Sequence, residues 1–168
     1  MAEIVDSLRL VKQKKRLRRI LNLQRDITYL DKQLQGPSGM RITDMPKSQK
    51  PTNKEQQIIQ RIMEKEKQLT ALKKDFTQED VILRKVIRKF DDLAETSATE
   101  DTILQLQDIL IYHYLQDWSM KEIYKIFAGS GKFKEDSDED SNMRNLYKKH
   151  AKAIDMFEKC QLGECVGV

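Results

Sequence analysis

The side chains best suited to chemistry lie between residues 141 and 152, where amides, a guanidinium and several ammonium groups share one side of a predicted helix. Arg and Asn can each form two hydrogen bonds to a guanine or adenine edge, and lysines neutralise phosphates. The polar side contains Asn142, Arg144, Asn145, Lys148, Lys149 and Lys152. The opposite side contains Met143, Leu146, Tyr147, Ile154 and Phe157. This pattern predicts a helix from Ser141 to Lys159 with one side for a core and one for DNA.

No other group of residues has the types and spacing of a catalytic or metal site. Residues 129–132, GSGK, lack the earlier glycine, the preceding strand and the following Ser or Thr of a phosphate-binding P-loop. His113 and His150 have no Cys, Asp or Glu at spacings that complete a metal site or a catalytic triad. Cys160 and Cys165 are the only cysteines, with no second pair to complete a zinc site. We therefore expect no enzyme activity, no cofactor and no metal.

The composition indicates a helical protein. The 168 residues include three Pro and six Gly, 35% are charged, and the net charge is +4. Such a chain favours long helices over sheets and has room for one domain or two small ones. The start of the sequence lacks the apolar stretch of a signal peptide, and no apolar run approaches the roughly 18 residues of a membrane span. We expect an all-α protein in the cytoplasm, without membrane contact.

The first 96 residues predict a long helical hairpin or a coiled coil. Apolar residues recur at alternating spacings of three and four between residues 16 and 34, and again between residues 53 and 76. The two stripes are Ile20, Leu23, Ile27, Leu30 and Leu34, then Ile58, Ile62, Leu69, Leu72 and Phe76, interrupted by Lys65. A loop at 36–53, which holds all three prolines, separates them. We predict that this half mediates self-association or contact with another protein.

Three capping patterns divide the rest of the chain. Thr77 precedes an Asp by three residues, and Ser97 and Ser119 each precede a Glu by three, as in the capping box that begins a helix. We predict a new helix after each of them, and a second domain over residues 97–168. The helix after Ser119 should end at residues 129–131, which contain two glycines, and Trp118 should pack between the helices on either side of it.

The segment LQDILIYHYLQDWSMKEIYKIF, residues 106–127, is similar to the start of the helix-turn-helix in region 4 of sigma factors. MRNLYKKHAKAIDMF, residues 143–157, is similar to the recognition helix that ends such modules. A basic first helix, the loop PSGMRITDMP at residues 37–46 and a charged helix pair precede them. This layout, from about Leu17 to Phe157, resembles phage transcriptional regulators of the ArpU/RinA type, which carry sigma-70-like C-terminal domains. The chain departs from the family at Tyr124, where a small residue is usual, and in a connection of about a dozen residues, 128–140, before the last helix.

The resemblance implies a sequence-specific DNA-binding regulator that activates late phage genes for packaging and lysis, in the cytoplasm of the bacterial host. Its partners would be double-stranded DNA and, as a further candidate, RNA polymerase. The N-terminal helices are predicted either to form a homo-oligomer or to contact the transcription machinery. The expected DNA-binding residues are Lys121, Ser141, Asn142, Arg144, Asn145, Lys148, Lys149 and Lys152. The alternative is a coiled-coil interaction protein, an antirepressor or polymerase-binding factor, that does not bind DNA itself. Sequence alone leaves the two open.

Overall fold

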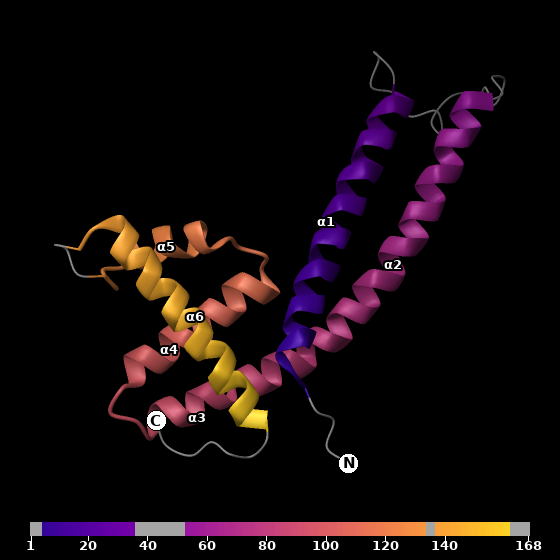
Figure 1. Ribbon diagram of the computed structural model, residues 1–168. Coiled ribbons are helices and arrows are strands. Elements are labelled where there is room, and N and C mark those ends of the chain that lie inside the picture. Colours follow the sequence, from indigo (N-terminus) through magenta and orange to yellow (C-terminus); the bar gives the residue numbers. More distant parts are fainter. Residues whose placement is uncertain (1–4, 36–52, 134–136, 162–168) are drawn as a thin grey trace. The chain divides into compact units, whose positions relative to one another are not determined.

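The computed structural model describes residues 5–35, 53–133 and 137–161, and every regular element in these ranges is a helix, which confirms the all-α prediction (Figure 1). The elements are α1 (Ser7–Gln35), α2 (Asn53–Ile87), α3 (Lys89–Glu95), α4 (Glu100–Leu110), the π-helix η2 (Ile111–Leu115), α5 (Met120–Gly129) and α6 (Glu139–Gln161). The predicted loop at 36–53 and Cys165 lie outside the described residues, except that Asn53 begins α2.

The chain forms two compact units whose boundaries differ from the predicted ones. The larger unit combines residues 1–17 with residues 78–168, and the hairpin unit comprises residues 18–77. The predicted division between residues 96 and 97 therefore does not coincide with the division of the structure. The physical reason is that the first turns of α1 and the last turns of α2 contribute side chains to the core of the larger unit.

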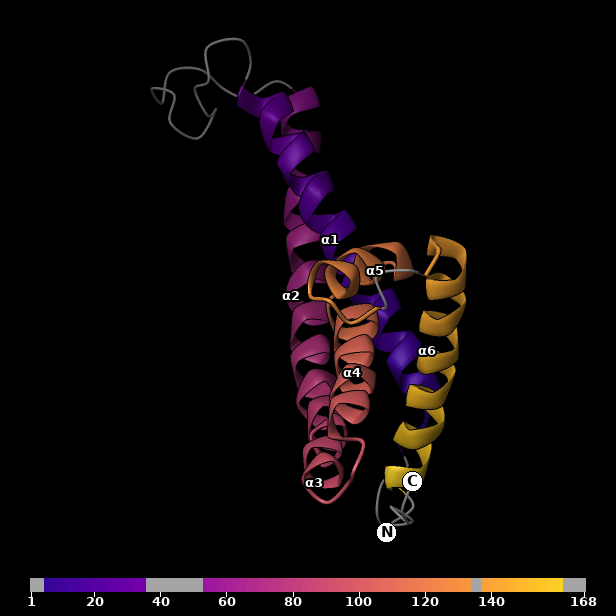
Figure 2. The ribbon, with the colours of Figure 1, turned by 90° about the vertical axis from the view of Figure 1, so that its left-hand side faces the viewer.

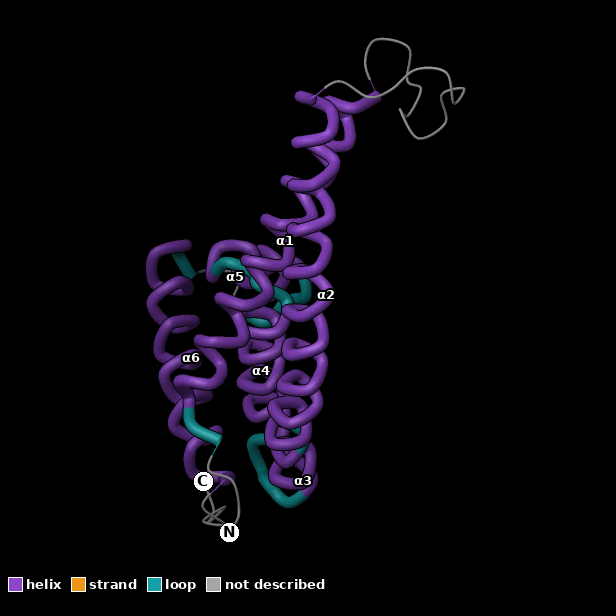
Figure 3. Tube along the Cα trace, turned by 90° about the vertical axis from the view of Figure 1, so that its right-hand side faces the viewer, coloured by secondary structure: helices purple, strands orange, loops and turns teal. Residues whose placement is uncertain are grey.

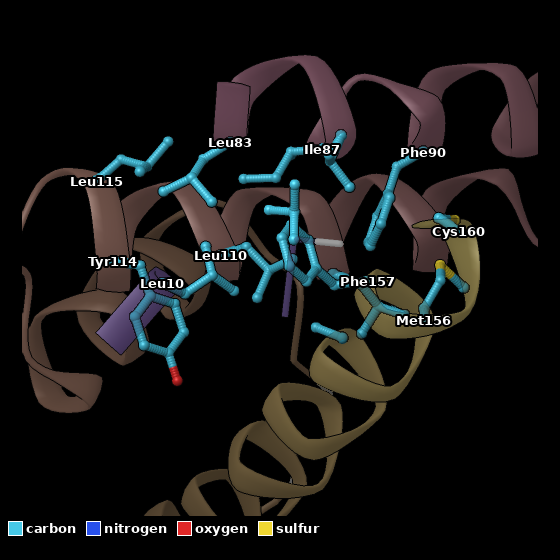
Figure 4. Close-up of a cluster of buried hydrophobic side chains, with 14 of the residues drawn as sticks. Leu10, Leu83, Ile87, Phe90, Leu110, Tyr114, Leu115, Met156, Phe157 and Cys160 are labelled. Carbon is cyan, nitrogen blue, oxygen red and sulfur yellow. The ribbon is translucent and has the colours of Figure 1, made fainter. Parts of the chain in front are cut away.

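That core is built from elements far apart in the sequence (Figure 4). Leu10 of α1, Leu83 of α2 and Leu110 of α4 are each fully buried, and so are Phe90 of α3 and Phe157 of α6. Fully burying a side chain of this size stabilises a fold by about 1.5–3 kcal/mol. The core therefore makes the start of α1, the end of α2 and α3 part of the larger unit, although all three were predicted to belong to the N-terminal domain.

A charged pair reinforces this packing at the edge of the core. The guanidinium of Arg9 donates from Nε to Glu79 Oε1 at 2.6 Å and from Nη2 to Glu79 Oε2 at 2.8 Å. Two parallel hydrogen bonds of this kind are among the stronger polar contacts in proteins. The hydrogen bond to Arg9 lowers the pKa of Glu79. The start of α1 is thereby tied to the last turns of α2.

The capping patterns had different outcomes. Ser119 caps α5 as predicted: its Oγ accepts from Glu122 N at 3.3 Å, and its own N donates to Glu122 Oε2 at 2.7 Å. The predicted helix start at Thr77 is wrong, because α2 continues through it and its hydroxyl donates to Lys73 O at 2.8 Å. The predicted cap at Ser97 is also misplaced, because α4 begins after Thr99, whose backbone N donates to Ser97 Oγ at 3.1 Å.

The hairpin unit consists of antiparallel stretches of α1 and α2 (Figure 1). All ten stripe residues of the two helices are buried or partly buried, with Ile20 and Ile58 the most buried. Lys65, which interrupts the second stripe, forms an ion pair with Asp26 at 2.7 Å across the pair of helices. The two apolar stripes therefore pack against each other within one chain, as in the helical hairpin that was one of the two predicted alternatives.

Within the larger unit, α4 and α6 pack against each other and cross in the view of Figure 1, and α5 packs against α6 and η2 (Figures 2 and 3). A second core fills the space among α4, α5 and α6. It consists of Ile109, Met120, Ile123, Phe127 and Leu146. This small core fixes α5 against the first half of α6.

Candidate nucleic-acid interface

The corner between α4 and α5 is set by a π-turn and a left-handed residue. Gln116 N donates to Ile111 O at 3.1 Å, the spacing of a π-helix, and Trp118 N donates to Tyr112 O at 2.9 Å. Asp117 has φ of 58°, a conformation that Asp tolerates better than most residues. The Trp118 ring stacks on Tyr112 with centroids 4.9 Å apart and packs against the second core. The aromatic pair therefore braces the corner, consistent with the role predicted for Trp118.

Residues 12–19 of α1 form a basic block, and one of its lysines, Lys14, is buried at this corner. Lys14 Nζ lies 3.3 Å from Trp118 O, 3.6 Å from Asp117 Oδ1, and 3.0 Å and 3.3 Å from the Nδ1 and Nε2 atoms of His113. His113 Nδ1 lies 2.9 Å from Trp118 O. Because ammonium only donates and carbonyl only accepts, a neutral ring that donates from Nδ1 and accepts at Nε2 satisfies both. Lys14 is thus a structural residue and is removed from the block that could contact phosphates.

Both histidines of the chain prefer the neutral state in this environment. Burial lowers the pKa of His113 to about 4, and the positive charge of Lys14 adds to the effect. Burial and the charge of Lys14 likewise lower the pKa of His150, whose Nε2 lies 3.0 Å from Tyr114 Oη. The two histidines therefore belong to the packing between η2 and α6.

The end of α5 positions the next lysine. Gly131 has φ of +69°, and its N donates to Ala128 O at 3.2 Å, while Lys132 N donates to Phe127 O at 3.0 Å. This pair of bonds is the Schellman motif, which terminates a helix and reverses the chain. The predicted helix end at 129–131 is confirmed, since α5 ends at Gly129. Lys132 follows at a fixed position, with its Nζ 3.1 Å from Asp108 Oδ2.

The beginning of α6 lies two residues earlier than predicted, because Asp138 acts as its cap. Asp138 Oδ1 accepts from Ser141 N at 2.6 Å, and Oδ2 accepts from Ser141 Oγ at 3.0 Å. These hydrogen bonds lower the pKa of Asp138. Glu139 and Asp140 form an exposed acidic first turn. Negative charges here suit the helix dipole, but they repel phosphate.

The predicted DNA-contacting residues separate into two groups. The exposed ones are Lys121 on α5 and Arg144, Asn145, Lys148 and Lys152 on α6. Ser141 is partly buried and is occupied by its bonds to Asp138. Lys149 is partly buried and donates to Gln105 of α4, and burial together with the charge of Lys132 lowers its pKa.

The prediction that Asn142 contacts DNA is wrong, because this residue is buried. Its side chain is 6% exposed, its Nδ2 donates to Ser137 O at 3.3 Å, and its Oδ1 accepts from Ser137 Oγ at 2.7 Å. It fastens the incoming loop to the helix and is not available to a base edge. Tyr147, predicted to face the core, is 54% exposed instead. The buried apolar residues of α6 are Leu146, Ala153, Met156, Phe157 and Cys160, and the predicted core residues Met143 and Ile154 are partly buried.

An open groove lies beside the first half of α6 and adjoins its exposed polar side. It is lined by Lys132, Phe133, Ser137, Asn142, Asn145, Lys148 and Lys149. Sequence patterns did not indicate Lys132 as a member of this group. The signal that could have identified it was Gly131, which permits the turn that brings the loop back over α6.

Among residues 5–35, 53–133 and 137–161, no group of three or more His, Cys, Asp or Glu side chains is placed to hold a metal ion. In the same part of the chain, no helix is both long and apolar enough to cross a membrane. Comparison with family models, with curated proteins and with solved structures found no match.

Proposed function

We propose that the larger unit binds double-stranded DNA through the exposed side of α6, and that the protein is a sequence-specific transcriptional regulator. The observation that carries this proposal is the division of α6 into two sides. Arg144, Lys148 and Lys152 follow one another at four-residue spacing and are exposed, while Leu146 and Phe157 are fully buried on the other side. A helix anchored in this way presents its cations at fixed positions, as major-groove recognition requires.

The exposed residues would have different roles. Arg144 and Asn145 carry the groups that pair with base edges, and Lys148 and Lys152 would neutralise phosphates, together with Lys121 on α5. The acidic first turn sets the direction of approach, because Glu139 and Asp140 would repel the DNA backbone. The middle of α6, rather than its N-terminus, would therefore lie in the major groove of the DNA.

The resemblance to phage regulators supplies the biological part of the proposal, which is activation of late genes with RNA polymerase as a candidate partner. The hairpin unit would then supply the contact with polymerase or with a second copy of the chain. It exposes Tyr29 and Met63, with 63% and 64% of their surfaces accessible. Single exposed apolar residues are common on protein surfaces, so these two mark positions at which the alternative, an interaction protein that never touches DNA, can be tested.

The first experiment is selection of the fragments of the source genome that the full chain retains, followed by titrations of the best fragment and of a scrambled duplex. Replacing Arg144 with Ala should weaken the specific complex by about 1–3 kcal/mol and relax the preference at one base pair. Replacing Lys148 with Ala should weaken both duplexes equally and lower the slope of log K against log salt by about 0.9.

Lys85 provides the matched control, because it is an exposed lysine of the same unit on α2 and is not among the residues of the proposed interface. Lys85→Ala should leave the affinity for both duplexes close to that of the original chain. If Arg144→Ala and Lys148→Ala behave like this control, α6 does not contact DNA. Binding of polymerase by such a chain would then favour the interaction protein.

A further inference from the structure

The groove beside α6 differs from the rest of the proposed interface because it gathers three lysines around one open space. Lys132 enters from the loop after α5, and Lys148 and Lys149 enter from α6. Like charges at close range destabilise each other unless an anion lies among them. Burial lowers the pKa of Lys149, and the positive charge of Lys132 adds to the effect.

The nearby acceptors do not neutralise the three charges. Lys132 has one carboxylate partner, Asp108 at 3.1 Å, and its Nζ also lies 4.5 Å from the centroid of the Phe127 ring. The partner of Lys149, Gln105, is uncharged. Among the described residues, the lining of the groove holds three lysines and no carboxylate, and counting Asp108 as a partner of Lys132 leaves a surplus of two positive charges. The ammonium groups also have hydrogen-bond donors to spare, since each has three.

The walls of the groove are held in place before any ligand arrives. On one side, the Phe133 ring packs against Tyr124 with centroids 5.3 Å apart and against Phe127 at 6.3 Å. On the other side, Ser137 and Asn142 bind each other through two hydrogen bonds. These contacts fix both described ends of the loop, and with them the position of Lys132. A site fixed in this way loses little freedom when it binds.

We propose that this groove is a phosphate site, in which Lys132, Lys148, Lys149 and the side-chain amide of Asn145 hold one phosphate group. All four line the same groove and carry donor groups, which suits an anion with several oxygens. The phosphate comes either from the DNA backbone, in which case the site extends the proposed function, or from a free phosphate-bearing ligand. The site rests on the proposed function only in the first case.

The test is a titration of the 15N-labelled full chain with inorganic phosphate, replacing chloride at constant ionic strength. The side-chain amide signals of Asn145 should shift and saturate, with a dissociation constant of roughly millimolar order. Lys132→Gln should weaken this binding about fivefold, the factor expected for removing one unit charge about 4 Å away in water. Lys148→Gln, at an exposed position that tolerates substitution, should do the same, and Lys85→Gln should not.

A second titration, with a DNA duplex at several salt concentrations, identifies the source of the phosphate. If Lys132→Gln lowers the salt slope by about 0.9, the groove holds a phosphate of the backbone. If phosphate binding is present but the slope is unchanged, or the chain binds no DNA, the ligand is a free phosphate compound, and the proposed function is judged separately. Absence of a saturable shift at Asn145 together with an unchanged slope would overturn the proposal.

Discussion

The half-buried histidines His113 and His150 predict that the protein loses stability as the pH falls below about 6.5. The pKa of His113 is about 4 in the folded chain because burial and Lys14 disfavour the charged ring. In the unfolded chain it should be about 6.5. As the pH falls, the unfolded chain therefore takes up a proton before the folded chain does. The stabilisation is fully present above about pH 6.5 and is lost progressively towards pH 4.

The size of the effect follows from these two pKa values. Between pH 7.5 and pH 5, protonation of His113 in the unfolded chain should remove about 2 kcal/mol of the free energy of unfolding. His150 adds a loss of the same sign, because its pKa is also lowered. These are the only two histidines of the chain. The carboxylates with lowered pKa values, such as Glu79, titrate below this range and do not contribute to it.

Urea unfolding of the full chain and of His113→Gln, at pH 7.5 and pH 5, measures the effect. Glutamine can donate to Trp118 O and accept from Lys14 without titrating, so it keeps the polar contacts of His113. The variant should lose about 2 kcal/mol less than the original chain between the two pH values. His150→Gln is the companion variant and isolates the contribution of the second ring. An equal loss for His113→Gln and the original chain would refute the reasoning.

Three further predictions concern the fold. Leu10→Ala should cost about 2–5 kcal/mol in urea unfolding because Leu10 is fully buried in the larger unit; Leu8→Ala, at a position 61% exposed on the same helix, should cost little. Ser119→Ala should cost about 1 kcal/mol through loss of the α5 cap, and Thr77→Ala almost nothing, since it lies inside α2; equal costs would contradict the assigned helix starts. Asn142→Ala should lower stability by about 1–3 kcal/mol by removing the two hydrogen bonds between Asn142 and Ser137. A changed base preference with unchanged stability would instead place Asn142 on the DNA-binding surface.

The sequence predicted the features that depend on local pattern. The cap at Ser119 is correct because Ser and Glu three residues apart meet on the first helical turn, whatever the rest of the chain does. The same reasoning failed at Thr77, where the apolar residues Phe76, Leu83 and Ile87 continue to face packing partners and the helix continues with them. Tertiary packing outweighed a local start signal worth about 1 kcal/mol.

The features that were not predicted depend on contacts between distant residues. Nothing local indicates that Leu10 shares a core with Phe157, and this long-range contact moved the domain boundary. The burial of Asn142 depends on Ser137 and on the course of the loop before it. Polarity indicated which residues could reach DNA, but the course of the chain decided which of them are exposed.

The helix with the largest surplus of positive charge is α1, which is not part of the proposed DNA interface. The α1 sequence holds nine Lys and Arg against two Asp, whereas α6 holds five against four acidic residues. Burial of Lys14 and the pairing of Arg9 with Glu79 use two of the α1 charges for the fold, and Lys12 and Lys15 remain exposed in the same unit. If the groove holds one phosphate and Lys121 and Lys152 each neutralise another, three phosphate contacts give a salt slope of about 2.7. A steeper slope would need further phosphate contacts. Lys12 and Lys15 are candidates for them because they are exposed cations of the same unit. The salt dependence thus measures whether α1 is only a structural helix or also lies against the DNA backbone.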